Sequence, residues 1–300
     1  PSTTSSHSIR VTISVLSSLT NMSTKGIEES LLIIACILLS PVFVQSFLQH
    51  STDPLKLGWK TQAQPPISES RTALCSEPTD SNFGRRDYWN EVYQKESNYS
   101  WYAGWDELEP FCNEFFEMEH DPRILIPGVG NDAALVGMYD AGYHHLTAMD
   151  YAPEGIERCR DMLGSERIRS SEGNDDEGVE LLVADARDLK GVLEDDSFDG
   201  ILEKGTLDAI FLSGGKDKKE ANKNMELAIE ELTRCLRPGG IFMSITAVVV
   251  GQIQAAFDSR QDEWECLVDE DSIYMTDDGF TSNNIDGNLL VWKKRIPEES

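Results

Sequence analysis

Two glycines and an acid near the middle of the chain have the types and spacing needed to hold a nucleotide. Gly128 and Gly130 follow a short apolar run, and Asp150 ends another apolar run twenty residues after Gly130. Glycine lets the backbone pass close beneath a ligand, and a carboxylate at a strand tip can accept hydrogen bonds from both ribose hydroxyls. The spacing therefore predicts a site for an adenosine-type cofactor.

The segments around these residues predict the elements that position them. A strand is expected at 124–126, a helix follows with its apolar face over 134–139, and a second strand is expected at 146–149. Strand, glycine turn, helix, strand and acid together form a nucleotide-binding βαβ unit. Such a unit fits two cofactors, a dinucleotide and S-adenosylmethionine.

The rest of the chain continues the alternation of strands and helices and then breaks it. Helices are expected at 108–118, 153–163 and 224–236, charged loops at 164–178 and 216–223, and further strands at 179–183, 200–202 and 241–246. The last two strands, 264–268 and 289–293, have no long helix between them and are expected to form a hairpin at one sheet edge.

This pattern predicts an α/β fold of the class I methyltransferase (Rossmann-like) type. Its seven-stranded, mostly parallel sheet has an antiparallel closing hairpin and helices on both faces. A dinucleotide dehydrogenase would instead continue with parallel strands, so the pattern favours S-adenosylmethionine. Asp185 follows the third strand, where its carboxylate can accept from an adenine amino group, and the backbone N–H of Ala186 can donate to the ring.

Several stretches resemble the eukaryotic elongation factor 1-alpha lysine methyltransferase family. The likeness is to the branch that includes the methyltransferase-like 13 protein and elongation factor 1-alpha lysine methyltransferase 4, and it covers about 82–296. The stretches are Tyr88-Trp89-Asn90-x-x-Tyr93, Ser100-Trp101-Tyr102, Ile124 to Asn131 (ILIPGVGN), Asp150-Tyr151 and Leu202 to Ala209 (LEKGTLDA). One departure is Asn131-Asp132, where the family has Asn-Ser.

The resemblance implies a protein-lysine N-methyltransferase that acts on a translation elongation factor. It also implies which residues contact S-adenosylmethionine. These are Trp89, Tyr93 and Trp101 closing over it, Gly128 and Gly130 beneath it, Asp150 and Tyr151 at the ribose and adenine, Asp185 and Ala186 at the adenine, and Lys204 near its methionine end.

The adjacent charged pair Glu203-Lys204 in the LEKGTLDA stretch is expected to serve the reaction. Lys204 is a fixed cation that can pair with the methionine carboxylate. Glu203 is the candidate catalytic residue, with two roles open: it orients the incoming amine, or it accepts from the ammonium group of the cofactor. The alternatives are a methyltransferase of a small molecule or of another protein, and a non-catalytic S-adenosylmethionine-binding scaffold.

Composition excludes two partner classes. The formal net charge is −27, which repels phosphate backbones, so no nucleic-acid substrate is expected. The six cysteines form no C-x-x-C pair, so no metal site is expected. A basic protein would instead be attracted to the acidic chain. Oligomeric state cannot be deduced from these features.

The first 80 residues are expected to lie outside the folded domain, which is assigned to 82–297. Residues 22–46 have the basic start, short apolar core and small-residue end of a signal peptide, with Met22 as the expected start. The tail over 47–80 is rich in Ser, Thr, Pro and Gln and resembles a plastid transit sequence. A plastid protein, such as elongation factor Tu, is then the expected substrate. If these residues are an upstream extension, the protein is cytoplasmic and elongation factor 1-alpha is the expected substrate.

Overall fold

The structure is a computed structural model that describes residues 82–95, 98–170 and 177–297. The expected presequence, with its signal and transit-like segments, lies outside the described residues, so those assignments and the domain boundary stay predictions. Part of the charged loop at 164–178 also lies outside them. Within the described part of the chain, no helix is both long and apolar enough to cross a membrane.

A single seven-stranded sheet runs through the described residues in the order β3-β2-β1-β4-β5-β7-β6. The strands from β3 to β5 are parallel, and β7 is antiparallel to both of its neighbours. The predicted fold class is therefore confirmed. The strands are β1 (Arg123–Pro127), β2 (His145–Asp150), β3 (Gly178–Val183), β4 (Phe198–Lys204), β5 (Leu236–Thr246), β6 (Trp264–Val268) and β7 (Asn288–Lys294).

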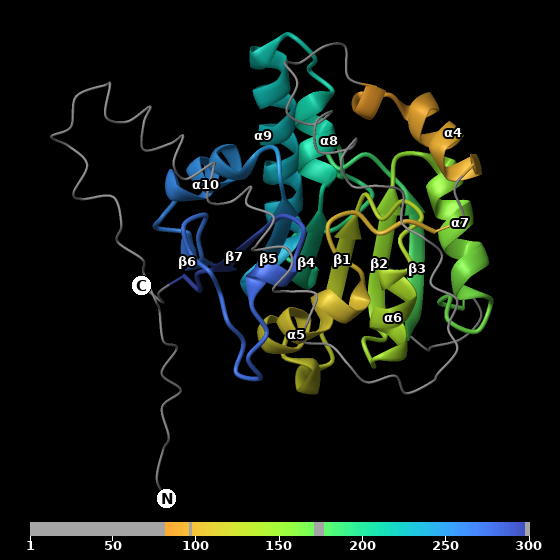
Figure 1. Cartoon of the computed structure of the whole chain (residues 1–300), viewed down its shortest axis with the longest axis horizontal. Coiled ribbons are helices and arrows are strands. Elements are labelled where there is room, and N and C mark those ends of the chain that lie inside the picture. The colour runs from red at the N-terminus through yellow and green to blue at the C-terminus, as the bar shows by residue number, and fades with distance from the viewer. Residues whose placement is uncertain (1–81, 96–97, 171–176, 298–300) are drawn as a thin grey trace, which may run out of the picture. The chain divides into compact units, whose positions relative to one another are not determined.

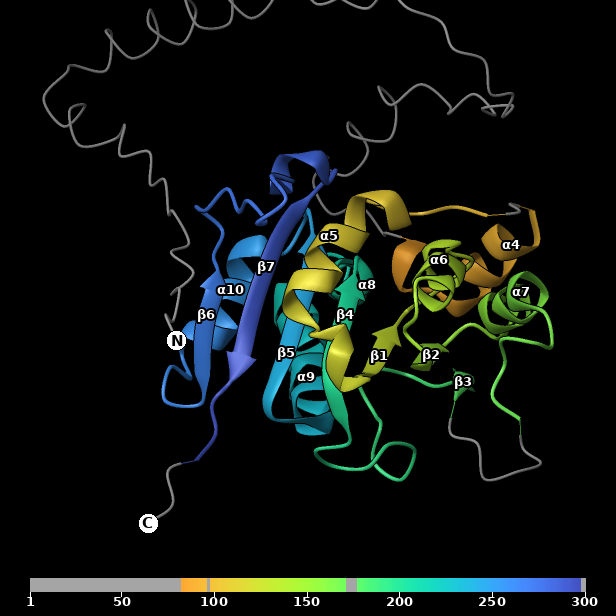
Figure 2. The ribbon, with the colours of Figure 1, turned by 90° about the horizontal axis from the view of Figure 1, so that it is seen from below.

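Helices cover both faces of this sheet, as Figures 1 and 2 show. One face packs against α5 (Trp105–Phe115), α6 (Ala134–Asp140) and α7 (Pro153–Leu163), and the other against α8 (Thr206–Leu212), α9 (Lys218–Cys235) and α10 (Val250–Asp258). The alternation along the strands produces these two cores. In β1, Ile124 and Ile126 belong to the first core and Leu125 to the second. Strand β1 thus has both faces covered, which explains its continuous apolar run.

Local sequence explains why α9 is longer than predicted. The charged segment 216–223 was expected to be a loop, but α9 begins at Lys218. Asp217 is its N-cap, and its carboxylate accepts from the backbone N–H groups of Lys219 and Glu220. Lysine and glutamate are good helix formers, so a capped run of them continues the helix outward.

Two other expectations need correction. The helix expected at 108–118 begins three residues earlier, because Glu107 caps the N–H of Gly104. Strand β5 begins at Leu236, yet its pairing with β4 jumps from Leu236 to Ile241, so the predicted turn at 237–240 bulges out of the strand. The expected antiparallel hairpin of β6 and β7 is present at one sheet edge, where β6 is the outermost strand. Helices α8 and α10 were not predicted.

The N-terminal aromatic segment packs at the edge of the domain that holds the glycine turn. It consists of a short 3-10 helix, Asn82–Gly84, and α4 (Arg86–Lys95). Helix α4 contacts α7, and the 3-10 helix contacts α8. Both partner helices follow directly from the carboxyl ends of parallel strands. The segment therefore lies over the strand ends (Figure 1), where open α/β sheets bind their ligands.

Candidate active site

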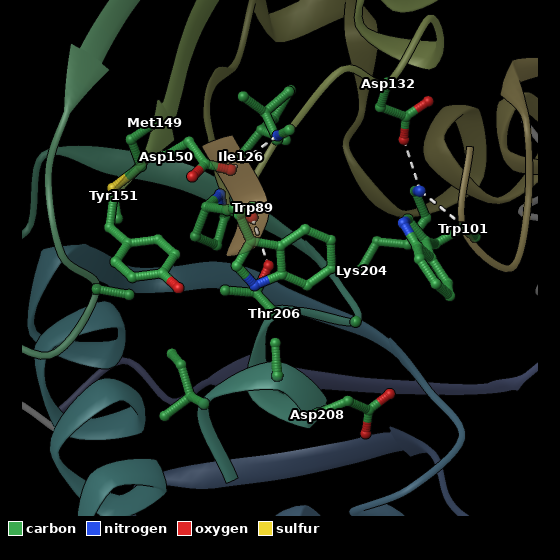
Figure 3. Close-up of a pocket in the computed structure, with 18 of the residues that line it drawn as sticks. Trp89, Trp101, Ile126, Asp132, Met149, Asp150, Tyr151, Lys204, Thr206 and Asp208 are labelled. Atoms are coloured by element: carbon green, nitrogen blue, oxygen red, sulfur yellow. Dashed lines mark hydrogen bonds and ion pairs between the residues drawn. The ribbon is translucent and has the colours of Figure 1, made fainter. Parts of the chain in front are cut away.

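One cavity at the carboxyl ends of the parallel strands brings the predicted cofactor residues together (Figure 3). All ten of them line it, although they come from six separate segments of the chain. They are Trp89, Tyr93, Trp101, Gly128, Gly130, Asp150, Tyr151, Asp185, Ala186 and Lys204. Glu203, the predicted catalytic residue, is not among the lining residues.

The glycine turn has no space for side chains. Gly128 and Gly130 have φ values of +63° and +58°, in the left-handed region that favours glycine. A Cβ on Gly128 would lie 2.1 Å from the hydroxyl oxygen of Thr206, and one on Gly130 would lie 2.8 Å from the hydroxyl oxygen of Tyr93. The two glycines therefore let three segments converge on the floor of the cavity.

Asp150 is buried at the end of β2, with 3% of its surface exposed. Its carboxylate accepts from the backbone N–H groups of Gly130 at 3.0 Å and Ala152 at 2.8 Å, and from the Tyr93 hydroxyl at 3.4 Å. Burial raises the pKa of Asp150 to about 6, although these hydrogen bonds act in the opposite direction. The carboxylate is therefore under-solvated, and further donors such as ribose hydroxyls would stabilise its charge.

Aromatic rings form the wall nearest Asp150. Trp89 stacks on Tyr93 with ring centroids 5.6 Å apart, and its indole N–H donates to the carbonyl of Phe83 at 2.6 Å. The hydroxyl of Tyr151 is buried and has no hydrogen-bond partner among the described residues. A buried hydroxyl without a partner is costly, so this cavity wall fits a polar ligand group better than an apolar one.

Asp185 has a partner that the sequence interpretation did not single out. Arg187 donates to both carboxylate oxygens, from Nε at 2.9 Å and from Nη2 at 2.7 Å. The pKa of Asp185 is lowered because these bonds outweigh its burial. Since Arg187 also lines the cavity, the predicted adenine end carries a fixed ion pair instead of a lone acid.

Lys204 is also paired in a way that the sequence did not predict. Its ammonium lies 2.5 Å from the carboxylate of Asp132 and donates to the carbonyl of Trp101 at 2.7 Å, as the dashed lines in Figure 3 show. Both charged side chains are 10% exposed. Asp132 also accepts from the Ser100 hydroxyl and from the N–H of Ala134. Asp132 stands where the resembling family has serine, and that departure was the sequence feature that could have drawn attention to Asp132.

The geometry places Glu203 behind the cavity wall, and its catalytic role stays a prediction. Its side chain is fully buried, and its two oxygens accept from the N–H of Leu207 and from the hydroxyl of Ser244. Burial raises its pKa to about 7. In this position Glu203 neither lines the cavity nor presents an unpaired oxygen to an amine. The side chain instead ties the start of α8 to β5, because successive strand residues point to opposite faces and Lys204 takes the cavity side.

Asp208 is a cavity residue that the sequence reasoning missed. It lies in the first turn of α8, is 3% exposed and lines the cavity. Its carboxylate accepts five hydrogen bonds: from the hydroxyls of Tyr102 and Thr246 and from the backbone N–H groups of 247, 248 and 249. Its place in the LEKGTLDA stretch was a visible signal, but the sequence analysis gave roles only to the preceding pair, Glu203 and Lys204.

The fold and the site together have the arrangement predicted for a class I methyltransferase domain. The described residues contain no group of three or more His, Cys, Asp or Glu side chains placed to hold a metal ion. Residues 125–244 match a family model described as a methyltransferase domain. The match runs from β1 into β5 and therefore includes the glycine turn, Asp150, Asp185 and the LEKGTLDA stretch.

Similar curated proteins carry names from the family that the sequence resembles, so that resemblance is confirmed. The eEF1A lysine and N-terminal methyltransferase homolog of Drosophila melanogaster is 30% identical over 171 residues, which cover 56% of this chain and 23% of that protein. The EEF1A lysine methyltransferase 4 of Bos taurus is 29% identical over 190 residues, covering 59% of this chain and 67% of that protein. The chain thus spans less than a quarter of the length of the first of these relatives.

Proposed function

We propose that this protein is an S-adenosylmethionine-dependent protein-lysine methyltransferase that acts on a translation elongation factor. The observation that carries the proposal is the single cavity lined by all ten predicted cofactor residues. The match to a methyltransferase domain supports the reaction class. The names of the relatives, which refer to lysine methylation of eEF1A, support the substrate.

The residues of the cavity fit S-adenosylmethionine in type and order. The under-solvated carboxylate of Asp150 would accept from the ribose hydroxyls, and the unpaired hydroxyl of Tyr151 would bond a polar atom on the same side. At the other end, Lys204 would face the methionine carboxylate and Asp132 its ammonium group. The Lys204–Asp132 ion pair thus presents both signs of charge to a zwitterionic group.

The proposed reaction requires the chain to align a neutral amine and keep water away. When bound, S-adenosylmethionine supplies an electrophilic methyl group on a positively charged sulfur. An unperturbed lysine has a pKa of about 10.4, so its amine must lose a proton before it can attack. The aromatic wall around Trp101 and Tyr102 would desolvate the amine and thereby lower its pKa. Alignment within this cavity would supply most of the rate enhancement.

An acidic segment that includes β6 supports a basic protein substrate. The segment 261–292 contains no lysine or arginine. Between β6 and β7 it exposes Ile273, Met275 and Phe280 by 54%, 58% and 41% among acidic residues. Further along this segment, the backbone N–H of Asp286 donates to the carbonyl of Tyr102, a cavity residue, at 2.7 Å. Apolar side chains beside acids suit a basic polypeptide, whereas they do not suit a nucleic acid.

The test is transfer of a labelled methyl group to purified elongation factor 1-alpha, followed by mass spectrometry of its lysines. We expect a lysine of the factor to be methylated, and transfer to be lost when the acceptor protein is omitted. Cofactor binding without transfer to the factor or to any protein of a whole-cell extract would favour the scaffold alternative. Transfer to a different protein, or to a small molecule, would overturn the substrate assignment and keep the reaction class.

We place the protein in the cytoplasm, because the relatives are named for eEF1A, a factor of cytoplasmic translation. The names of these relatives give no support for a plastid factor. Fusing residues 22–80 to a fluorescent protein tests the placement. A diffuse cytoplasmic signal is expected, and accumulation of the fusion in plastids would overturn it.

A further inference from the structure

Tyr102 is held in an unusual conformation on the cavity wall. Its φ of +66° lies in the left-handed region, which is uncommon for a bulky residue and persists only where the surrounding structure enforces it. Gly205 makes room for the ring, because a Cβ there would lie 2.9 Å from it, and a Cβ on Gly287 would lie at ordinary contact distance from the same ring. The N–H of Asp286 holds its carbonyl. Tyr102 is therefore fixed at both backbone and ring.

Asp208 fixes the hydroxyl of this tyrosine and the direction of its hydrogen bond. The Tyr102 hydroxyl lies 2.8 Å from Oδ2 of Asp208. Because four other donors surround the same carboxylate, Asp208 acts only as an acceptor, and Tyr102 must donate. Burial beside Asp208 raises the pKa of Tyr102, so the phenol keeps its proton. The Tyr102 oxygen can therefore still accept a hydrogen bond from a bound substrate.

The position of Tyr102 relates it to the acceptor side of the cavity. It directly follows Trp101, whose carbonyl accepts from Lys204 at 2.7 Å, and its ring packs on Gly205. It therefore lies beside the residues that would face the methionine end, away from Asp150 and the ribose side. A lysine amine has N–H donors and, when neutral, one lone pair that must point at the methyl group.

We propose that the Tyr102 oxygen accepts an N–H from the incoming lysine amine and thereby aims its lone pair, with Asp208 as the residue that positions Tyr102. This inference rests on the proposed function and adds a residue to it that acts on the substrate and not on the cofactor. No bond forms or breaks at Tyr102. The amine gives its proton to solvent before attack, and the phenol proton stays on the hydrogen bond to Asp208.

The test is Tyr102→Phe, which keeps the ring between its glycines and removes only the oxygen. With elongation factor 1-alpha as the acceptor we expect kcat to fall about 100-fold, the cost of a misaligned amine. The Kd for S-adenosylmethionine and the KM for the protein should each stay within about twofold of wild type. Tyr143→Phe is the matched control, because its hydroxyl bonds Asn113 at 3.0 Å and its buried ring lies outside the cavity.

Asp208→Asn tests the positioning role, because it should lower kcat to the level of Tyr102→Phe. The double variant should then lose no more than either single one, since both remove the same alignment. If Asp208→Asn does not fold, Tyr102→Phe decides alone. An unchanged kcat for Tyr102→Phe, or a loss confined to cofactor affinity, would overturn this inference while wild-type transfer upholds the proposed function. No transfer to any lysine by the wild type would overturn both.

Discussion

The two ends of the cavity differ in how their polar groups are satisfied. At the end formed by Asp150 and Tyr151, one carboxylate has a raised pKa and one buried hydroxyl has no partner. At the other end, Lys204 is paired with Asp132, and Asp208 accepts five hydrogen bonds. Figure 3 shows the two groups on opposite sides of Trp89. One end is incompletely satisfied by protein groups alone, and the other is already organised.

This difference predicts which end of the cavity determines cofactor affinity and which end holds the substrate in a fixed geometry. A ligand that satisfies unpaired buried groups gains affinity, because it relieves a penalty already present in the protein. Groups that are already paired do not reorganise during reaction, so they hold a substrate in a fixed geometry. We therefore expect variants at the Asp150 end to change cofactor affinity, variants of Lys204 to change stability as well as affinity, and variants of Asp208 to change turnover.

The largest effect is expected from Lys204→Met. This change keeps the apolar stem and removes the charge, so the Asp132 carboxylate is left buried without its cation. Breaking a buried pair in this way costs about 3–5 kcal/mol, measured here as the free energy of unfolding in urea.

The matched control is Lys190→Met, because Lys190 lies 3.9 Å from Glu231 but is 74% exposed. Its loss should cost about 0–1 kcal/mol. Equal stabilities of the two variants would break the comparison, because Asp132 would then be stabilised by groups other than Lys204.

The second effect is a loss of cofactor affinity in Asp150→Ala. The variant removes the acceptor for two ribose hydroxyls, and charge-assisted bonds contribute about 1.5–3 kcal/mol each. Isothermal titration calorimetry with S-adenosylmethionine measures the change. Asp140→Ala is the control, because Asp140 is an exposed acid paired with Arg167 outside the cavity. An unchanged Kd in a folded Asp150→Ala protein would mean that the ribose lies elsewhere.

The third effect is a pH dependence of stability that Glu203 should cause. Burial raises its pKa from the ordinary 4.5 to about 7, so the folded state binds a proton more tightly than the unfolded chain. Its favourable contribution is complete below pH 4.5 and is lost as the pH rises through 7. Glu203→Gln cannot titrate and should lack this loss, which is on the order of 3 kcal/mol. The free energy of unfolding, measured at several pH values, tests this expectation. If it changes with pH in the same way in Glu203→Gln and in the wild type, Glu203 does not have the raised pKa.

Much of this architecture was readable in the chain, and what was missed within the site has one cause. The apolar runs, the glycine turn and the acid at the tip of β2 predicted the sheet and ten cavity residues, because period and spacing are local properties. The partners Asp132 for Lys204 and Arg187 for Asp185 could not be deduced, since the choice of partner depends on side-chain geometry. The position of Glu203 off the cavity wall was missed for the same reason: adjacent strand residues face opposite ways, and only the structure shows which of the pair faces the cavity.

The smallest effect is expected on the acidic surface between β6 and β7. Asp278 is exposed in the turn next to Phe280, and its conversion to lysine would repel a basic substrate without altering the cavity. We expect the KM for elongation factor 1-alpha to rise about 2- to 5-fold at low salt, with kcat and cofactor Kd unchanged. The difference should shrink as salt screens exposed charges. Glu226→Lys is the matched control. It makes the same charge change at an exposed position of α9, which packs on the sheet face opposite α5. If both variants raise KM equally, overall charge and not this surface attracts the substrate; if neither does, docking is apolar or lies elsewhere.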